Sequence, residues 1–388
     1  MSVMNRPYNI LQVIDKFSMD GVNPSSCAYL IRDWHRYADK ERFNIIACGL
    51  KHEEPAGHIY KDEGIPVFFL GNGKYSPGNV TGLMELIDRE QIDLLHLHGY
   101  SSANFGRIAA RLKKIPNIVH EHAILDILPH QYVADWVLRG LTDCAVGVSD
   151  AVSEFLIKGR HVPRKRTDVV YNGVNLDTFV RSDTVALDRL RREFSLNKEH
   201  FIIGTLTRLR QEKGNEILIR AMRQVVDKYP HVRLLIAGDG PLWDPLEALI
   251  AELGLREHVR LIGFRRDVMD LLTLFDMMVV PSFNEGFGLM LVEALAMGVP
   301  VVASRVGGLI EISGEPPCTR LVSAGDPNAF AREILYLLEH PETRKEMAAK
   351  GLEQSKKFSI QNNINRLQEI YLSLLKKNNH SLNKEGSQ

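Results

Sequence analysis

Short apolar runs alternate with longer amphipathic stretches along the whole chain. The runs lack polar alternation, which is typical of strands buried on both faces of a parallel sheet, and the stretches between them have helical periodicity. A first series of runs predicts strands at 9–14, 43–48, 67–70, 92–97, 117–119, 144–148 and 168–171. A second series predicts strands at 202–206, 232–237, 259–262, 277–280 and 299–303. We therefore expect an α/β fold with two doubly wound units.

A turn at 172–175 and a highly charged stretch at 181–200 separate the two series, so we expect a linker near 172–182. After the second series, Ile364, Leu367 and Ile370 form an apolar helical stripe, and the last residues are polar without periodicity. The predicted organisation is an N-terminal domain, a C-terminal domain, a helix that packs back on the first domain, and a disordered tail, at 1–175, 176–362, 363–375 and 376–388.

Composition narrows the class of protein. A chain of 388 residues with 45% hydrophobic content can build two cores, and 48 basic residues balance 48 acidic ones, which gives no reason to expect nucleic acid as a partner. The four scattered cysteines predict neither disulfides nor a zinc site. Since no secretory signal or apolar run of about 20 residues is found, we expect a cytoplasmic protein. The basic segment 158–166 follows the apolar residues 155–157; it is either a solvated loop or a contact with anionic lipid at the inner membrane face.

The most informative chemistry lies at 284–294, where a glycine-rich turn joins a predicted strand to an apolar helix. Gly286 and Gly288 allow a bulky anion to approach the backbone, and a helix N-terminus suits a phosphate. Glu285 lies on this turn. Glu293 lies among apolar residues of the helix, where a carboxylate needs a partner such as the two vicinal hydroxyls of a ribose; otherwise it is a solvated helix residue.

Cationic side chains follow the first strand of the second series. Arg208 and Lys213 come directly after 202–206, and the carboxyl ends of parallel strands are where this architecture binds ligands. A guanidinium and an ammonium group together suit a diphosphate. Arg210 could take the place of Arg208, and all three could be surface charges.

Two His-x-His pairs end neighbouring strands of the first series. His96 and His98 form one pair, and His120 and His122 form the other; alternate residues project to the same face of a strand. A metal site is conceivable, but no carboxylate or cysteine ligand set accompanies the pairs in sequence, so no metal is predicted. We expect His98 and His122 to lie nearer the ligand, where an imidazole can hydrogen-bond a sugar hydroxyl or phosphate, and the other two to lie lower on the strands.

Taken together, these motifs resemble the retaining glycosyltransferases of the GT-B fold, in particular glycosyltransferase family four, over about residues 8–375. The matching segments are Glu-x7-Glu at 285–293, Arg-x4-Lys-Gly at 208–214, Asn-Gly-Val at 172–174, the Gly-Asp-Gly-Pro turn at 238–241 and the glycines at 307–308. The resemblance implies two Rossmann-like domains that face each other across a cleft. It also implies a nucleotide-diphosphate sugar, a UDP- or GDP-sugar, as the donor substrate, with no further cofactor required.

The resemblance also implies individual roles. Arg208 and Lys213 would hold the diphosphate, Glu285 would contact the donor sugar, and Glu293 would bind the ribose. His122 would act at the sugar, with His120 as the alternative. Backbone N–H groups around sugar and phosphate would come from Gly286, Phe287, Gly288 and Leu289.

The chain departs from the family pattern after its first strand. Members often carry a double glycine there, whereas this chain has Asp20 and Gly21. The resemblance therefore implies a contact to the diphosphate from Gly21 alone, in a loop that departs from the family pattern. The predicted activity is transfer of a sugar to a hydroxyl acceptor, carbohydrate or lipid-linked, in polysaccharide, lipopolysaccharide or glycolipid assembly. The rival hypotheses are a GT-B-like epimerase, phosphorylase or sugar-phosphate synthase, and a nucleotide-sugar-binding protein without catalysis.

Overall fold

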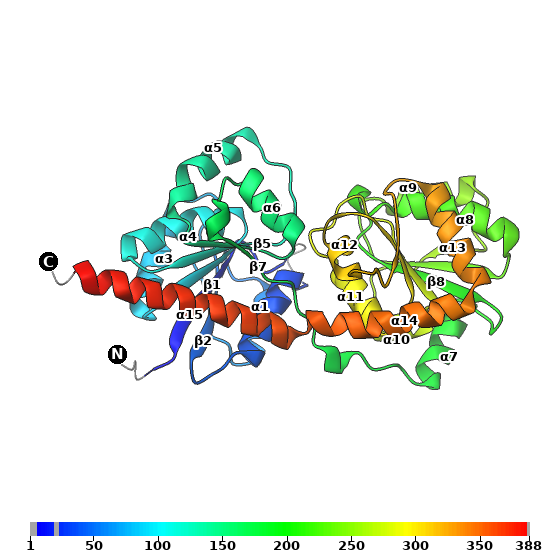
Figure 1. Ribbon diagram of the computed structural model, residues 1–388, viewed down its shortest axis with the longest axis horizontal. Coiled ribbons are helices and arrows are strands. Elements are labelled where there is room, and N and C mark those ends of the chain that lie inside the picture. The colour runs from blue at the N-terminus through cyan, green and yellow to red at the C-terminus, as the bar shows by residue number, and fades with distance from the viewer. Residues whose placement is uncertain (1–5, 19–22, 386–388) are drawn as a thin grey trace. The chain divides into compact units, whose positions relative to one another are not determined.

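A computed structural model describes residues 6–18 and 23–385 (Figure 1). The chain forms two compact units. Unit 1 contains Met1–Gly173 and Ile360–Gln388, and unit 2 contains Val174–Ser359. The first crossing between the units therefore falls in the segment where the sequence predicts a linker, and the chain returns to unit 1 for its last helix.

The described part of unit 1 is a parallel sheet covered by helices, with strand order β3-β2-β1-β4-β5-β6-β7. All seven strands coincide with apolar runs of the first series, so that prediction is confirmed. The strands are β1 Tyr8–Ile14, β2 Phe43–Gly49, β3 Val67–Phe69, β4 Leu94–His98, β5 Asn117–Glu121, β6 Cys144–Gly147 and β7 Thr167–Val169. The helices are α1 Ser26–Tyr37, α2 His58–Asp62, α3 Gly78–Arg89, α4 Tyr100–Lys113, α5 Pro129–Leu138, α6 Asp150–Lys158 and α15 Ile360–Glu385.

Helix α15 completes the core of unit 1. Its apolar stripe, which includes Ile364, Leu367 and Tyr371, is buried in the same cluster as residues of β1, β2 and α1, and α15 lies beside α1 (Figure 1). The helix also continues to Glu385, where the sequence predicts a disordered tail from residue 376. That prediction is wrong for 376–385 because no proline or glycine interrupts an established helix there, and propagating a helix is far easier than starting one. Asn378 also donates a hydrogen bond of 3.1 Å to the backbone oxygen of Lys114.

Unit 2 is a second parallel sheet, with strand order β10-β9-β8-β11-β12-β13. The strands are β8 Phe201–Leu206, β9 Val232–Ala237, β10 Val259–Leu261, β11 Met277–Val280, β12 Val301–Ser304 and β13 Arg320–Val322. The helices are α7 Thr184–Glu193, α8 Asn215–Lys228, α9 Trp243–Glu252, α10 Val268–Leu274, α11 Leu289–Ala296, α12 Gly307–Ser313, α13 Pro327–Glu339 and α14 Pro341–Ser355.

Strand β13 is the element that the hydrophobic pattern does not predict. It has three residues, begins with Arg320 and pairs only with β12, so it presents no continuous apolar run. Its Arg320 side chain instead reaches Glu333 of α13 at 2.6 Å. Edge strands tolerate such polar residues because one side of the strand is not paired.

Both sheets reverse their strand order next to their first strand. In unit 1 the reversal lies between β1 and β4, and in unit 2 it lies between β8 and β11. In open α/β sheets, ligands bind beyond the carboxyl ends of the strands at such a switch point. We therefore expect the ligand-binding residues of each unit among those that follow these four strands.

Candidate functional site

The switch point of unit 2 joins two of the predicted residues directly. Lys213 follows β8 and Glu285 follows β11, and the Lys213 Nζ lies 2.6 Å from the Glu285 Oε1. The Ser282 hydroxyl donates to the same carboxylate oxygen at 3.1 Å. Both charged side chains are about 15% exposed, so the pair is shielded and still open to a ligand. No sequence motif indicates a role for Ser282, although it stands three residues before Glu285.

Gly214 allows the two turns to approach each other. Its φ is +64°, and a Cβ placed on it would lie 2.1 Å from the backbone oxygen of Pro281, so any side chain here would push the turns apart. The Phe283 N–H also donates to the backbone oxygen of Glu212 at 2.9 Å. The glycine after Lys213 is therefore what lets the lysine reach Glu285.

The glycine-rich turn and the start of α11 lie next to this ion pair. Gly288 is the N-cap of α11 with φ +110°, and a helix begins with N–H groups that lack intrahelical acceptors. The backbone oxygen of Glu285 accepts from the Gly308 N–H at 3.2 Å, and a Cβ on Gly307 would lie 2.1 Å from that oxygen. Close packing of the β11 turn against the start of α12 thus fixes the position of Glu285.

Glu293 lies one turn and more into α11, among the buried side chains of Leu291, Val292 and Ala294. Its own side chain is partly exposed, and within the described residues it makes no hydrogen bond or ion pair. Burial raises the pKa of the Glu293 carboxyl to about 7. A carboxylate held without a protein partner is available to a ligand, because a ligand donor would relieve the cost of burying its charge.

Arg208 is a predicted site residue that does not take part in the Lys213–Glu285 ion pair. Its side chain is exposed and forms no ion pair among residues 6–18 and 23–385; the same holds for Arg210. The backbone between them is fixed, because the Leu209 N–H donates to the Asp239 oxygen at 2.9 Å. The structure brings together Lys213 and Glu285 beside the α11 turn, and Arg208 stands at the same sheet edge with a solvated side chain.

The histidines form a second cluster, in unit 1. His96 and His98 lie on β4 and His120 on the adjacent β5, with His122 directly after it. His96 Nε2 lies 2.9 Å from His120 Nδ1, and His98 Nδ1 lies 3.0 Å from His122 Nε2. The sequence predicts that both His98 and His122 lie nearer the ligand, but His98 is only 1% exposed, and only His122 is partly exposed.

Polar partners from distant segments complete this cluster. His98 Nε2 lies 2.9 Å from the Gln12 amide oxygen, the Gln12 amide nitrogen donates to the Tyr371 hydroxyl at 3.1 Å, and that hydroxyl lies 2.7 Å from His96 Nδ1. Sequence reasoning missed Gln12 and Tyr371 because nothing local marks either residue. A glutamine within the apolar run at 10–14 is the one weak local signal that could have indicated a polar partner.

Burial keeps these imidazoles neutral. It lowers the pKa of His96, His98 and His120 well below the ordinary value, and lowers the pKa of His122 to about 4. The ring of Trp34 stacks on His96 and His120, which adds apolar surroundings. The cluster can therefore donate and accept hydrogen bonds at neutral pH without carrying charge.

The histidine cluster has a cysteine beside it, which bears on whether it could bind a metal. The sequence shows no cysteine close to the histidine pairs, but the structure places Cys27 Sγ 3.6 Å from His122 Nε2. The ligand atoms of Cys27, His98 and His122 all lie within 4.8 Å of one another. These donor types suit zinc, although burial raises the pKa of the Cys27 thiol and so opposes the thiolate that zinc requires.

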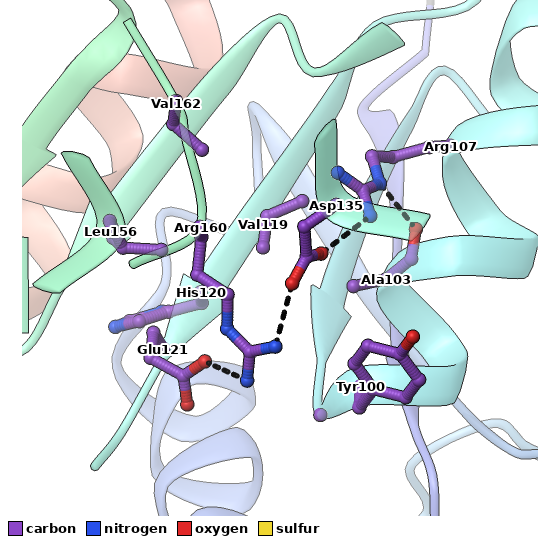
Figure 2. A pocket seen from close by; sticks show the side chains of 11 residues that line it. Tyr100, Ala103, Arg107, Val119, His120, Glu121, Asp135, Leu156, Arg160 and Val162 are labelled. Atoms are coloured by element: carbon purple, nitrogen blue, oxygen red, sulfur yellow. Dashed lines mark hydrogen bonds and ion pairs between the residues drawn. The ribbon is translucent and has the colours of Figure 1, made fainter. Parts of the chain in front are cut away.

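Gly21, with its neighbour Asp20, lies outside the described residues. In unit 1 a small pocket beside β5 is lined by an ion-pair chain of Arg107, Asp135, Arg160 and Glu121 (Figure 2).

The two Rossmann-like units define the fold as GT-B, the fold of a large class of glycosyltransferases, and solved structures agree. A glycosyltransferase from Rickettsia africae aligns with a TM-score of 0.85 at 20% identity, covering 95% of this chain and 99% of that one. HepE from Anabaena, solved in complex with UDP and glucose, aligns with a TM-score of 0.78 at 23% identity, covering 94% and 99%.

Family models match both units. The model described as Glycosyl transferases group 1 matches residues 188–354, and the model described as Glycosyltransferase Family 4 matches residues 29–178. The D-inositol 3-phosphate glycosyltransferase of Corynebacterium urealyticum is 30% identical over 307 residues, which are 73% of this chain and 72% of that protein. This chain belongs to the family 4 glycosyltransferases.

Proposed function

We propose that this protein is a retaining glycosyltransferase that moves a sugar from a UDP- or GDP-sugar to a hydroxyl acceptor. The observation that carries the proposal is the Lys213–Glu285 ion pair at the switch point of unit 2, beside the N-terminus of α11. A pure binding protein has no need for a carboxylate at the sugar next to a cation at the diphosphate. The complex of the Anabaena neighbour with UDP and glucose supports a nucleotide sugar as the donor class.

In this proposal the donor is held by groups of unit 2. Lys213 and Arg208 neutralise the diphosphate, and Glu293 accepts hydrogen bonds from the two ribose hydroxyls. Backbone N–H groups at the start of α11 surround sugar and phosphate, contributed by Gly286, Phe287, Gly288 and Leu289. Donor binding would then replace the Lys213 contact to Glu285 in part by a contact to phosphate, which leaves the carboxylate oriented by Ser282 and available to the sugar.

The reaction breaks the bond between the anomeric carbon and the diphosphate and forms a new bond to the acceptor oxygen on the same face. The leaving nucleoside diphosphate takes the bonding electron pair, and one of its phosphate oxygens takes the acceptor proton. Charge that develops on the diphosphate is stabilised by the helix N-terminus and by Lys213 and Arg208, once donor binding has brought these two cations to the phosphates. The products are a glycoside with retained configuration and a nucleoside diphosphate.

We propose His122 as the residue of unit 1 that hydrogen-bonds a sugar hydroxyl. It is the partly exposed member of its cluster, and its imidazole is neutral because burial lowers the pKa to about 4. His120 is the alternative, but it is only 1% exposed. His98 would act indirectly, since its hydrogen bond to His122 sets which nitrogen of His122 carries the proton.

For the acceptor we propose a carbohydrate or lipid-linked hydroxyl compound, in polysaccharide, lipopolysaccharide or glycolipid assembly at the cytoplasmic side of a membrane. The relative from Corynebacterium urealyticum is named for D-inositol 3-phosphate, a compound with several hydroxyl groups, which supports a hydroxyl acceptor for this chain. No helix among the described residues is long and apolar enough to cross a membrane.

A donor panel tests the proposal. Purified protein is incubated with UDP- and GDP-sugars, and both thermal shift and released nucleoside diphosphate are measured, with proton NMR of the product to establish anomeric configuration. Lys213→Ala and Glu285→Gln should each reduce kcat/KM by on the order of 10²–10³, as loss of a charge-stabilising group does. Lys228→Ala, at an exposed position of α8, is the matched control and should retain full activity.

The outcomes separate the rival functions. Transfer at near-normal rates by both site variants would overturn the proposed roles. An epimerised donor in the absence of acceptor would favour an epimerase, and phosphorolysis of a glycoside would favour a phosphorylase. Donor binding with neither transfer nor slow donor hydrolysis would favour a binding protein.

A further inference from the structure

Helix α5 presents its apolar side to solvent. Five side chains on one broad face, four of the helix and one of its N-cap residue, are between 50% and 62% exposed, and Leu125 in the preceding loop is 52% exposed. The five are Leu128, Tyr132, Val133, Trp136 and Val137. A surface helix of a globular protein normally turns its apolar stripe towards the core, so this orientation is the reverse of the usual one.

One buried acidic residue of α5 explains the orientation. Asp135, its single acidic residue, is 4% exposed, and its carboxylate lies 2.8 Å from Arg160 and 3.3 Å from Arg107. Arg160 also reaches Glu121, at the end of β5, at 3.3 Å (Figure 2). Rotating the helix to bury its apolar side would expose Asp135 and leave two buried guanidinium groups without it, which is strongly unfavourable. Buried ion pairs thus hold the apolar face outward.

Positive charges lie at the C-terminal end of this apolar face. The Arg139 guanidinium lies 4.3 Å from the centre of the Trp136 ring, and the Arg166 guanidinium donates to the backbone oxygens of Gly140 and Thr142 just after α5. These bonds place the basic segment 164–166 next to the helix end, where Lys165 is exposed. Tryptophan and tyrosine beside arginine and lysine are the side chains that occupy the boundary between lipid tails and headgroups.

We propose that this outward face of α5, together with Leu125 and the basic segment 164–166, docks on the surface of an anionic lipid membrane. The helix has ten residues and is about 15 Å long, so it lies in the plane of the interface and does not span the bilayer. Apolar side chains enter the acyl boundary while the cations contact phosphate groups. The mixed character of the surface decides the occupant: an apolar face with cations at one end complements anionic lipid. The proposal does not depend on glycosyl transfer.

Vesicle co-sedimentation of the full chain tests the apolar contribution. We expect binding to vesicles of phosphatidylcholine with 30% phosphatidylglycerol, as a chosen test composition, and much weaker binding to phosphatidylcholine alone. The double variant Val133→Ser/Trp136→Ser should bind more than tenfold more weakly, since two apolar side chains no longer enter the acyl boundary. The matched control Val180→Ser/Val185→Ser removes two side chains of unit 2 that are 68% and 71% exposed, and should bind as the unchanged protein does.

Charge is tested separately. Lys165→Glu should weaken binding to anionic vesicles by about fivefold or more and should not affect binding to neutral ones, whereas Lys228→Glu in unit 2 should have no effect. Circular dichroism and the midpoint of thermal unfolding show that each variant is folded. Because all the substituted side chains are exposed, both should match the unchanged protein.

Tryptophan fluorescence locates the contact. Trp34 is fully buried in unit 1 and Trp243 lies in unit 2, so a blue shift on adding anionic vesicles should come from Trp136 and be absent in Trp136→Phe. Absence of vesicle binding by the unchanged protein would overturn the proposal. So would a concentration-dependent dimer that Val133→Ser/Trp136→Ser dissociates, since a second copy of the chain would then cover this face.

Discussion

Replacing Glu293 by glutamine should stabilise the ligand-free protein at alkaline pH and not at acid pH. Burial raises the pKa of this carboxyl from its ordinary 4.5 to about 7. Between these values the folded chain holds a proton that the unfolded chain has lost, so the contribution of Glu293 to stability falls as pH rises from 4.5 to 7. Above pH 7 the ionised side chain costs at most about 3 kcal/mol, from about 1.36 kcal/mol per pKa unit. Glutamine has the same shape and carries no charge, so it avoids this cost.

Urea unfolding at pH 5 and pH 8 measures the effect. We expect the variant and the unchanged protein to differ little in free energy of unfolding at pH 5, and the variant to be more stable by up to about 3 kcal/mol at pH 8. Glu346→Gln, at an exposed position of α14, controls for the loss of one negative charge and should show no such pH dependence. A difference that is the same at both pH values would refute the reasoning, because it would show that Glu293 has no raised pKa.

The same carboxyl should make donor binding depend on pH. If ionised Glu293 accepts hydrogen bonds from the ribose, affinity for a nucleotide sugar, whose diphosphate does not titrate in this range, rises as pH rises through about 7, and the Glu293→Gln variant binds weakly with no step in that range. Calorimetric titration with a UDP-sugar and a GDP-sugar at pH 6 and 8, without acceptor, gives both affinities. An unchanged protein whose affinity is flat over this range, or a variant that keeps the step, would contradict the ribose role.

Three further outcomes are expected. Asp135→Asn should lower the free energy of unfolding by about 3–5 kcal/mol in urea titrations, because it leaves Arg107 and Arg160 buried without their shared anion; a loss below about 1 kcal/mol would contradict this. Gly214→Ala should abolish most activity in the donor assay, because a Cβ there meets a backbone oxygen at 2.1 Å and φ is +64°; a fully active variant would mean that the turns need not approach. The ratio of kcat/KM between the unchanged protein and His122→Asn should be constant from pH 6 to 8, since the His122 pKa is about 4; a pH-dependent ratio would show a titrating imidazole.

The sequence predicts those features of the site that lie within one turn of the chain. It does not predict the contacts between segments that are distant in sequence. The turn at 284–288 is a local pattern of glycines and a carboxylate after an apolar run, and the structure places it at a strand end as expected. The Lys213–Glu285 contact depends on β8 and β11 being neighbours although β9 and β10 lie between them in sequence. Strand order is a property of the whole sheet, and no local pattern encodes it.

The sequence by itself determined the two α/β units, because uninterrupted apolar runs can be buried only inside a sheet covered on both faces. It also determined which residue types lie at strand ends. Only the tertiary structure decided that Cys27 lies beside His122 and that α5 turns its apolar side outward. The physical reason is that each of these arrangements depends on which of several possible contacts is the more stable in the folded chain. In α5, the ion pairs of Asp135 with two buried arginines outweigh the burial of the hydrophobic stripe.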